Sequence, residues 1–320
     1  NGARPSALRG PVPVSIVVLT GGVGGAKLVL GLVHILPAGE VTAIVNTGDD
    51  FTHLGLAISP DIDTLLYTLA DKANAAQGWG REGETWSFLA ALRSLGGEDW
   101  FALGDGDLAL HVLRTARRAA GEPLSAIIAD FARAWGIGVA ILPMSDDPVA
   151  TVVETGDGPL AFQRYFVERR CEPAVQSIRF EGAGTARPAS GVIEAIHAAD
   201  AILIAPSNPF LSIDPLLAVP ALRAALGEAH APVVAVSPII GGAAVKGPTA
   251  KLMRELGLEV SNASIAAHYH GLIDGLVIHS GDDAPESVEL AHTDTMMRDE
   301  QDKVRVAEMA LMLARSIASR

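Results

Sequence analysis

The sequence is poor in cysteine, in aromatic residues and in positive charge. Cys171 is the single cysteine among 320 residues, so no disulfide can form within the chain, which favours a reducing, cytoplasmic location. The net charge of −13 argues against nonspecific binding to nucleic acid or to an anionic membrane surface. The apolar run Val12–Leu19 is too short to span a bilayer and leads into a glycine turn rather than a cleavage site. We therefore expect neither a nucleic-acid partner nor a membrane partner.

Glycine and aliphatic residues are abundant instead. The chain has 33 glycines and 49% hydrophobic residues but only 5% aromatic residues, a mixture typical of aliphatic parallel strands joined by short glycine turns. Ile16–Leu19 and Thr42–Val45 are continuous apolar runs that predict buried parallel strands, with a helix over about 26–36 between them. We predict an α/β fold with a Rossmann-like parallel sheet and helices on both faces.

The alternation of strands and helices is interrupted in the middle of the chain. Helical periodicity dominates from about Trp79 to Trp135, and it is followed by three predicted strands over 151–154, 160–167 and 175–180. The alternation then resumes with strands over 201–205, 232–236 and 275–279 and helices over 190–199, 246–256 and 299–316. We predict a disordered leader over 1–12, a Rossmann-like nucleotide- and metal-binding core formed by 13–63 and 186–320, and an inserted, mainly helical subdomain with a small sheet over 64–185.

A glycine-rich turn follows the first predicted strand and reads GGVGGAK over residues 21–27. The backbone N–H groups of Gly22, Val23, Gly24 and Gly25, at the start of a helix, are suited to phosphate, and Lys27 adds a positive charge. The pattern is neither a Walker A loop nor a strict GxGxxG, because Ala26 and Leu28 flank the lysine and Lys27 stands at the third glycine position. The alternative is a purely structural strand–helix turn.

Four carboxylates follow within 15 residues, at the end of the second predicted strand and at the start of the next helix: Asp49, Asp50, Asp61 and Asp63. Mg²⁺ prefers one or two carboxylates together with phosphate oxygens and waters, so this cluster predicts a magnesium site. The alternatives are an ordinary helix N-cap at Asp61, a solvated turn at Asp50 and a helix-dipole role for Asp63. Asn46, just before the acids, is either a site residue or a turn former.

Two further polar loops follow predicted strands of the same sheet. Ser207 and Asn208 lie between two prolines after the strand 201–205, and Ser237 and Gly241 follow the strand 232–236, with Lys246 shortly after. Ligands bind outside the carboxyl ends of the strands in open α/β sheets, so these loops are expected at the same edge as the glycine turn. For each loop, a plain turn is the alternative.

These motifs occur in an order that resembles a known family. TGGVGGAK, VNTGDD, SPDIDTLLYTLA, LGDGDLA, LPMSDDPV, APSNP, SPIIGG with KGP, and TDTMM together resemble the 2-phospho-L-lactate transferases (CofD/FbiA) nearly from end to end. The resemblance implies transfer of a phospholactyl, phosphoenolpyruvyl or phosphoglyceryl group from a guanosine diphosphate-linked donor to the ribityl hydroxyl of the deazaflavin Fo. GMP is released, and the product belongs to coenzyme F-420 biosynthesis.

The resemblance also implies Mg²⁺ dependence, a homodimer and roles for individual residues. Asp49 and Asp63 match the acids of the metal and acceptor site, and we expect Asp63 to orient the Fo hydroxyl. The glycine loop with Lys27, and the APSNP loop, match the nucleotide-diphosphate side. One departure concerns Ala102, since archaeal members carry a basic residue there that is thought to contact Fo.

The residues leave two other classes open. One is a nucleotide-sugar or NAD(P)-binding Rossmann enzyme, although the missing third glycine and the clustered acids argue against it. The other is a non-catalytic regulator of the same fold, for which loss of the acidic pair is expected, whereas Asp49 and Asp63 are present. The sequence does not distinguish among the three donors.

Overall fold

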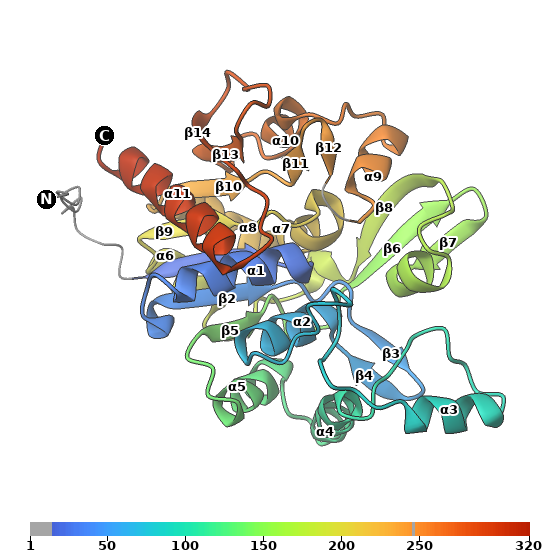
Figure 1. Cartoon of the computed structure of the whole chain (residues 1–320). Helices are drawn as coiled ribbons and strands as arrows, with labels where there is room; N and C mark the ends of the chain where they lie inside the picture. Colours follow the sequence, from blue (N-terminus) through green and yellow to red (C-terminus); the bar gives the residue numbers. More distant parts are fainter. Residues whose placement is uncertain (1–14, 245–246) are drawn as a thin grey trace, which may run out of the picture.

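The structure, a computed structural model, describes residues 15–244 and 247–320, so the leader predicted over 1–12 lies outside the described residues. The chain is built around one sheet of seven parallel strands in the order β14-β13-β10-β9-β1-β2-β5 (Figure 1). The strands are β1 Ile16–Thr20, β2 Val41–Val45, β5 Ala140–Pro143, β9 Ala201–Ile204, β10 Val233–Val236, β13 Gly275–His279 and β14 Glu289–Thr293. The predicted α/β class with a parallel sheet is confirmed.

Strand β1 lies near the middle of the sheet and all five of its residues are buried. Val17 and Leu19 belong to the hydrophobic core on one face, and Ile16 and Val18 belong to the core on the other. Successive side chains of a strand point to opposite faces, so a strand covered on both sides requires apolar residues at every position. This explains the continuous apolar run in the sequence.

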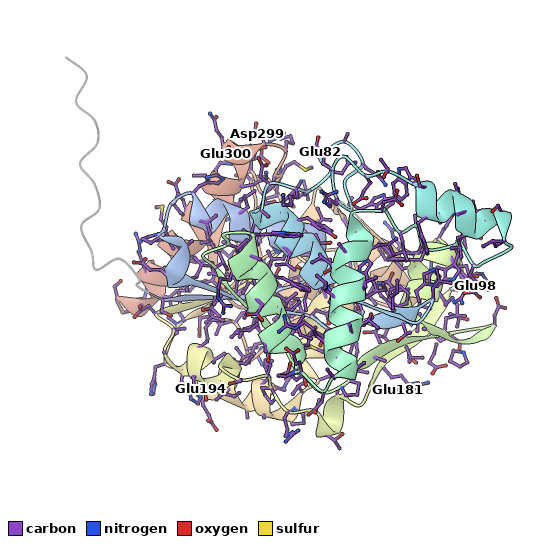
Figure 2. All side chains as sticks on the ribbon, turned by 90° about the horizontal axis from the view of Figure 1, so that it is seen from below. Glu82, Glu98, Glu181, Glu194, Asp299 and Glu300 are labelled. Carbon is purple, nitrogen blue, oxygen red and sulfur yellow. The ribbon has the colours of Figure 1, made fainter. Side chains whose placement is uncertain are left out.

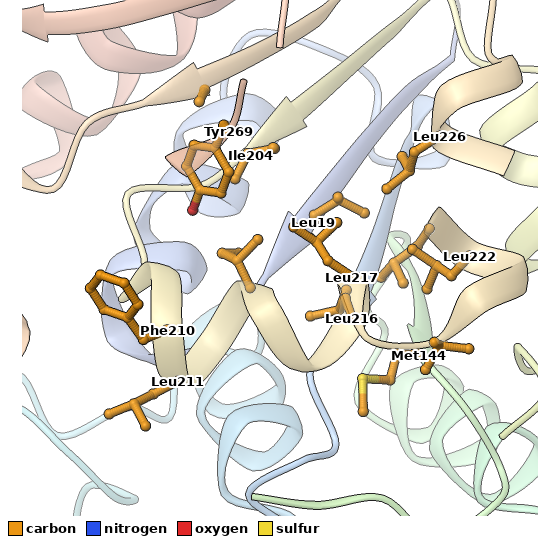
Figure 3. Packing of buried hydrophobic residues seen from close by; sticks show 14 of the residues in the cluster. Leu19, Met144, Ile204, Phe210, Leu211, Leu216, Leu217, Leu222, Leu226 and Tyr269 are labelled. Carbon is orange, nitrogen blue, oxygen red and sulfur yellow. The ribbon is translucent and has the colours of Figure 1, made fainter. Parts of the chain in front are cut away.

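Helices cover both faces of the sheet (Figure 1). The core that contains Ile16 and Val18 is completed by α1 Gly22–Val33, α2 Pro60–Leu69, α4 Asp107–Ala119, α5 Leu124–Ala134 and α11 Glu300–Ala318. The opposite core is completed by α6 Val192–His197, α7 Asp214–Leu217, α8 Pro220–Glu228, α9 Thr249–Glu255 and α10 Asn262–His268. Figure 3 shows the second core at close range, with the leucines of α7 and α8 gathered near Leu19 of β1.

The strand order places a switch point beside β1. The chain adds β2 and then β5 on one side of β1, and later adds β9, β10, β13 and β14 on the other side. Connections from β1 and from β9 therefore lead away from each other, which opens a crevice at the carboxyl ends of these two strands. The glycine turn follows β1 and the segment 205–208 follows β9, so the fold brings these two loops to that crevice.

Smaller elements surround the sheet. β6 Ala150–Thr155 pairs with β7 Gly158–Ala161 and β8 Val175–Glu181 in an antiparallel sheet, while β3 Phe51–His53 with β4 Leu56–Ile58 and β11 Ile239–Ile240 with β12 Ala243–Ala244 form hairpins. The remaining described elements are helix α3 Ser87–Ser94, the 3-10 turns Ala38–Glu40 and Ala183–Thr185, and the π-helical turns Arg164–Glu168 and Pro209–Ile213.

One of the local predictions was wrong, and two strands were not predicted. The strand predicted over 160–167 ends at Ala161, and the chain turns into a π-helical segment that buries Tyr165 completely and lets Arg164 pair with Glu168. The strands β5 and β14 were not predicted. β5 lies within 64–185, so this segment supplies one strand to the main sheet, and its definition as a separate subdomain stays a prediction. β14 is an edge strand with one neighbour, and its mixed sequence ELAHT gives no apolar run.

Among the described residues, no single helix is long and apolar enough to cross a membrane. One bent pair, Pro209–Leu217 with Pro220–Glu228, passes on length and composition only when its two helices are taken together across a bend of 86°. Its apolar residues Phe210, Leu216, Leu222 and Leu226 are buried in the core of the protein (Figure 3).

The close contact between α1 and α11 gives a stability prediction. A side chain added at Gly31 of α1 would collide with the carbonyl oxygen of Lys303 and lie 3.2 Å from its Cβ. Because both atoms belong to a packed helix, we expect Gly31→Ala to lower the free energy of unfolding by about 1–3 kcal/mol. Gly39→Ala, where no atom lies within 4 Å, is the matched control and should change little. Denaturant titration compares the two variants, and equal stabilities would contradict the predicted contact.

Candidate active site

The glycine turn allows close approach of three parts of the chain. Gly22 has a φ of +64°, a conformation that favours glycine. A Cβ at Gly21 would lie 2.5 Å from Oδ2 of Asp61, and a Cβ at Gly24 would lie 2.7 Å from the carbonyl oxygen of Pro206. The glycines therefore let the start of α1 approach both the loop after β9 and the start of α2.

Ser207 joins the two loops at the switch point. Its hydroxyl donates to the carbonyl oxygen of Gly21 at 2.7 Å, and the side chain is almost fully buried. Asn208 has a local role next to it, since its Oδ1 accepts from the backbone N–H groups of Phe210 and Leu211 at 3.0 and 3.2 Å. The APSNP segment thus fixes the position of the glycine turn and starts the π-helical turn Pro209–Ile213.

Asp61 does not cap its own helix. Ser59 occupies the N-cap position of α2, and the Asp61 carboxylate reaches the start of α1, where the Gly22 backbone N–H donates to it. Asn46 Nδ2 donates to Asp61 Oδ2 at 3.0 Å. Burial raises the pKa of Asp61 to about 6, although both hydrogen bonds oppose the shift. A carboxylate of the chain itself therefore lies at the helix N-terminus for which the sequence predicted phosphate.

Asp49 and Asp50 follow β2 in a loop that is held by its neighbours. Asn46 Oδ1 accepts from the Gly48 N–H at 2.7 Å. Asp49 is 5% exposed, and its pKa is raised well above the usual value by burial and then by repulsion from Asp61. Burial also raises the pKa of Asp50 to about 8, against the hydrogen bond of 2.7 Å that Ser59 Oγ donates to it. Asp49 Oδ1 and Asp50 Oδ1 are buried and have no hydrogen-bond partner among the described residues.

Asp63 forms a buried ion pair with Arg114 of α4. Both nitrogens Nη1 and Nη2 of Arg114 donate to the carboxylate, Nη1 at 3.1 Å from Oδ2, and the arginine side chain is fully buried. Arg114 Nη1 also donates to the Ala57 carbonyl oxygen of β4 at 3.2 Å. A bidentate pair of this kind fixes the orientation of the carboxylate. Asp63 is therefore held in one position by a residue 51 places later in the chain.

The Arg114 contact belongs to a polar stripe on α4, defined here as Asp107, His111, Arg114 and Arg118. The spacing of four, three and four residues puts these side chains on one helix face. The Tyr67 hydroxyl donates to Asp107, and His111 Nε2 lies 3.1 Å from Oδ2 of Asp107. Burial alone would raise the pKa of Asp107, but its partners, led by His111, lower it below the usual value. The stripe thus runs alongside α2, with Asp107 next to Tyr67 near the end of that helix and Arg114 next to Asp63 at its start.

A cleft of about 370 Å³ opens at the last residue of the polar stripe. Its walls are the loop after β2, the β3–β4 hairpin, α4, the start of α5 and the loop after β5. The polar residues that line it are Thr47, Asp50, Thr52, Ser59, Thr115, Arg118, Ser145, Asp146 and Asp147. The cleft therefore reaches the acidic loop from the side of the sheet on which α2 and α4 lie.

Comparison with known proteins shows to which family the chain belongs. The family model described as 2-phospho-L-lactate transferase CofD matches residues 16–316. The chain belongs to the CofD family. It is 44% identical to a phosphoenolpyruvate transferase of Streptomyces griseus over 94% of this chain and 99% of that protein. It is 38% identical to a 2-phospho-L-lactate transferase of Methanosarcina acetivorans over 93% of this chain and 98% of that protein.

The fold is also found in a solved structure of low sequence similarity. A UPF0052 family protein of Bacillus halodurans superimposes with a TM-score of 0.61 at 17% identity, covering 93% of this chain and 99% of that one, which supports the fold alone. Membership of the CofD family confirms the predicted resemblance and makes the chain a transferase of coenzyme F-420 biosynthesis. It decides against the NAD(P)-dependent and regulatory alternatives.

The CofD-family structure brings most of the predicted site residues together. Gly22, Asn46, Asp49, Asp61 and Ser207 meet where the loops after β1, β2 and β9 converge with the start of α2. The alternatives for two of the acids do not hold, because Ser59 rather than Asp61 is the N-cap of α2, and Oδ1 of Asp50 is buried rather than solvated. The roles assigned to these residues stay predictions.

Three predicted site residues of this CofD-family chain have structural roles that their contacts or conformation explain. The Lys27 ammonium donates to the Met297 carbonyl oxygen at 2.6 Å, which ties α1 to the segment before α11. Ser237 Oγ donates to Asn262 Oδ1 at 2.6 Å. Gly241, with a φ of +59°, lies in the turn of the β11–β12 hairpin, for which a glycine is suited. Lys246 lies outside the described residues.

Sequence reasoning missed the polar stripe of α4. Its signal was present, because DLALHVLRTARR places Asp107, His111, Arg114 and Arg118 at helical spacing within one segment. The predicted departure at Ala102 also has a structural context. Ala102 lines a small recess with Arg81, whose Nη1 lies 3.3 Å from Glu84 Oε1, so a guanidinium is present beside this position.

The acidic residues of this CofD-family member form two groups, one at the surface and one buried. Figure 2 shows Glu82, Glu98, Glu181, Glu194, Asp299 and Glu300 around the periphery of the molecule, whereas Asp49, Asp61 and Asp63 are buried. Among the described residues, no three His, Cys, Asp or Glu side chains are arranged to hold a metal ion by themselves. A cation at the buried acids would therefore need phosphate oxygens or waters as further ligands, which is the usual environment of Mg²⁺.

The Arg114–Asp63 pair gives a prediction on stability. Arg114→Met removes the guanidinium and leaves a buried carboxylate without its partner, so we expect the free energy of unfolding to fall by about 3–5 kcal/mol. The double variant Arg114→Met with Asp63→Asn removes that charge as well and should recover part of the loss. Chemical denaturation of these two variants and of the single variant Asp63→Asn measures the coupling. If the two changes were simply additive, the pair would not be the source of the effect.

Proposed function

We propose that this CofD-family enzyme transfers a phosphoenolpyruvyl group from a guanosine diphosphate-linked donor to the ribityl hydroxyl of Fo and releases GMP. The observation that carries the proposal is the meeting of the glycine turn with the acids of NTGDD and PDID at the switch point of the sheet. The choice of donor is supported by relatives called phosphoenolpyruvate transferases at 40–44% identity, whereas the relatives called 2-phospho-L-lactate transferases are 37–38% identical.

The reaction is a displacement at phosphorus. The Fo hydroxyl oxygen forms a bond to the phosphorus that carries the acid, and the bond from that phosphorus to the bridging oxygen of the diphosphate breaks. GMP leaves with the electron pair of the broken bond, and the hydroxyl proton is released. Catalysis of such a step depends on placing the two oxygens in line and on stabilising the charge of the phosphoryl groups.

The start of α1 would receive the diphosphate. The first turn of a helix leaves backbone N–H groups without intrahelical partners, and Gly22, Val23 and Gly24 in this turn are partly exposed. Ser207 holds the turn against the loop after β9. Lys27 is engaged with Met297, so the proposal gives the stabilisation of phosphate to the backbone and leaves a catalytic role of Lys27 as a prediction.

The buried acids fit a magnesium ion. Asp49 Oδ1 and Asp50 Oδ1 are buried without a hydrogen-bond partner among the described residues, and burial raises the pKa of each carboxyl, which disfavours its ionised form. A cation next to these oxygens would stabilise the ionised form. Asp49 is the ligand that we propose first. Mg²⁺ bound there would neutralise charge on the phosphates of the donor.

Asp63 has a distinct place in the proposal. Arg114 occupies two of the roughly four lone-pair sites of its carboxylate, so the remaining sites can accept a hydrogen bond from the Fo hydroxyl or contact the metal. Because Arg114 fixes the carboxylate, Asp63 would bind that hydroxyl without first being ordered. This is the positioning role predicted from the sequence.

A homodimer and a cytoplasmic location complete the proposal. The single cysteine supports a reducing compartment. Val112 and Leu113 of α4 are 51% and 53% exposed, and Leu95 at the end of α3 is 86% exposed, so apolar side chains for a subunit contact are available on this side of the protein.

The proposal is tested by weighing the product. We expect purified protein with Fo, Mg²⁺ and the phosphoenolpyruvyl donor to give the Fo phosphodiester and one equivalent of GMP, detected by mass spectrometry. The phospholactyl and phosphoglyceryl donors, run in parallel, decide the donor class by their kcat/KM. Absence of the Fo adduct with all three donors would refute the proposed function.

The metal site gives a separate prediction. Asp49→Asn keeps the shape of the side chain but removes the charge, so we expect Mg²⁺ binding to weaken by at least about tenfold, or about 1.4 kcal/mol. The measurements are the Mg²⁺ dependence of turnover and direct titration with Mn²⁺ followed by electron paramagnetic resonance. Asp157→Asn, at an exposed carboxylate paired with Arg169, is the matched control. Wild-type metal affinity in Asp49→Asn would remove Asp49 from the site.

A further inference from the structure

Arg118 is a basic residue in an unusual setting. It lies one helical turn after Arg114 on the polar stripe of α4, and it is the one basic side chain among those that line the cleft. Within the part of the chain that the structure describes, no hydrogen bond or ion pair joins its guanidinium to another residue. The preceding residue behaves differently, because Arg117 pairs with Glu122 and Asp130 at 2.5 and 2.7 Å.

The acids of the cleft, all of them described residues, form no ion pair with Arg118, although its positive charge acts on Asp50 and opposes the rise that burial causes in the pKa of that carboxyl. Asp146 accepts hydrogen bonds from the backbone N–H and the hydroxyl of Ser125 at the start of α5, at 2.7 and 2.8 Å. Asp147 pairs with Arg187 at 3.2 Å, and Asp50 accepts from Ser59. Asp146 and Asp147 thus have partners of their own, as has one oxygen of Asp50, and the guanidinium of Arg118 lines the cleft with no hydrogen bond or ion pair among the described residues.

A second observation points to a ligand in the same cleft. Thr47 lines it and is only 4% exposed, yet its hydroxyl has no hydrogen-bond partner among the described residues. A buried hydroxyl without a partner is costly, because its bonds to water are lost and not replaced. Thr47 belongs to the loop that carries Asp49 and Asp50, so a molecule that satisfies this hydroxyl lies next to the acidic site.

We propose that Arg118 binds the carboxylate of the phospho-acid group that is transferred, with Thr47 as an additional donor. This inference rests on the proposed function and names the residue that distinguishes the acid from other groups on the same phosphorus. The planar guanidinium offers parallel N–H donors that match the two oxygens of a carboxylate. The acidic side chains of the cleft have no such donors when they are ionised.

The position of Arg118 gives this contact a consequence for the reaction. Arg118, Thr47 and Asp50 all line the cleft, and Asp49 is the residue just before Asp50. Asp49 in turn interacts with Asp61, which accepts from the Gly22 N–H at the start of α1. A carboxylate held at Arg118 directs the attached phosphorus toward the acidic loop, and the diphosphate continues toward the glycine turn. Arg118 is thus a specificity-determining residue, whereas the bond changes at phosphorus take place at the neighbouring acids.

Arg118→Gln tests the inference with two donors. One is the guanosine diphosphate-linked phosphoenolpyruvyl donor, and the other is the ethyl ester of GDP, whose transferable group lacks the carboxylate. We expect Arg118→Gln to lower kcat/KM for the first donor by about 10- to 100-fold and to leave the second donor unchanged. The preference of the wild type for the carboxylate donor should therefore nearly disappear in the variant.

Two further variants serve as controls. Arg118→Lys keeps a charge without the planar fork and should recover only part of the preference. Arg117→Gln changes the adjacent arginine, whose partners lie on the protein surface, and should keep the wild-type preference. Since Arg118 makes no hydrogen bond or ion pair within the described chain, Arg118→Gln should also keep the thermal stability of the wild type.

The outcomes separate this inference from the proposed function. If the wild type makes the Fo adduct and Arg118→Gln keeps the full preference for the carboxylate donor, the inference fails while the function stands. If Arg118→Gln instead raises KM for Fo alone, the cleft binds the acceptor, and the inference also fails. If the wild type makes no adduct with any donor, the function fails and the inference falls with it.

Discussion

The buried ion pair between Asp63 and Arg114 determines how the acidic start of α2 meets the polar stripe of α4. Asp63 belongs to the first turn of α2, which packs on the large sheet, and Arg114 belongs to α4, which the chain forms about fifty residues later. Removing these charges from water is costly, and the close bidentate contact, the hydrogen bond to the Ala57 carbonyl oxygen and the neighbouring His111 ring compensate for it. The pair therefore tolerates little displacement of α4 relative to α2.

Other features of the site follow from this constraint. With α4 held in place, the Thr115 hydroxyl accepts the Ala57 N–H at 2.7 Å, and Tyr67 reaches Asp107. The same helix face then brings Arg118 to the end of the acidic loop. Figure 2 shows α4 and α5 on the surface that covers this side of the molecule. The cleft is thus formed between the β3–β4 hairpin and a helix that the salt bridge and these hydrogen bonds hold against α2.

Much of the fold could be predicted because the sheet has a simple chemical signature. β1, β2, β9, β10 and β13 are buried on both faces and read as continuous aliphatic runs, so their sequence alone identifies them. β14 could not be recognised, since an edge strand has no need of such a run. The short β5 was missed because a run of four residues before a polar loop gives little periodicity.

The site was predictable in part for a related reason. Asp49, Asp61 and the glycine turn lie at the ends of recognisable strands, and the rule for the carboxyl edge of the sheet places them together. Arg114 and Arg118 escaped prediction because tertiary packing, rather than a local motif, aims the face of α4 at the acids. The reach of Asp61 across to Gly22 was also hidden, since an aspartate near a helix start usually serves its own helix.

The contact of Asp61 with the Gly22 N–H has a consequence for the way in which a substrate would enter. The positive end of α1 is already matched by a negative group of the protein, so a nucleotide arriving by itself meets repulsion where a helix end normally attracts it. A nucleotide that arrives together with a divalent cation meets the opposite situation, because the cation can lie between the phosphate and the carboxylates. Under the proposed function, Asp61 would therefore act as an electrostatic filter that admits a metal–nucleotide complex and discourages free phosphate from occupying the turn.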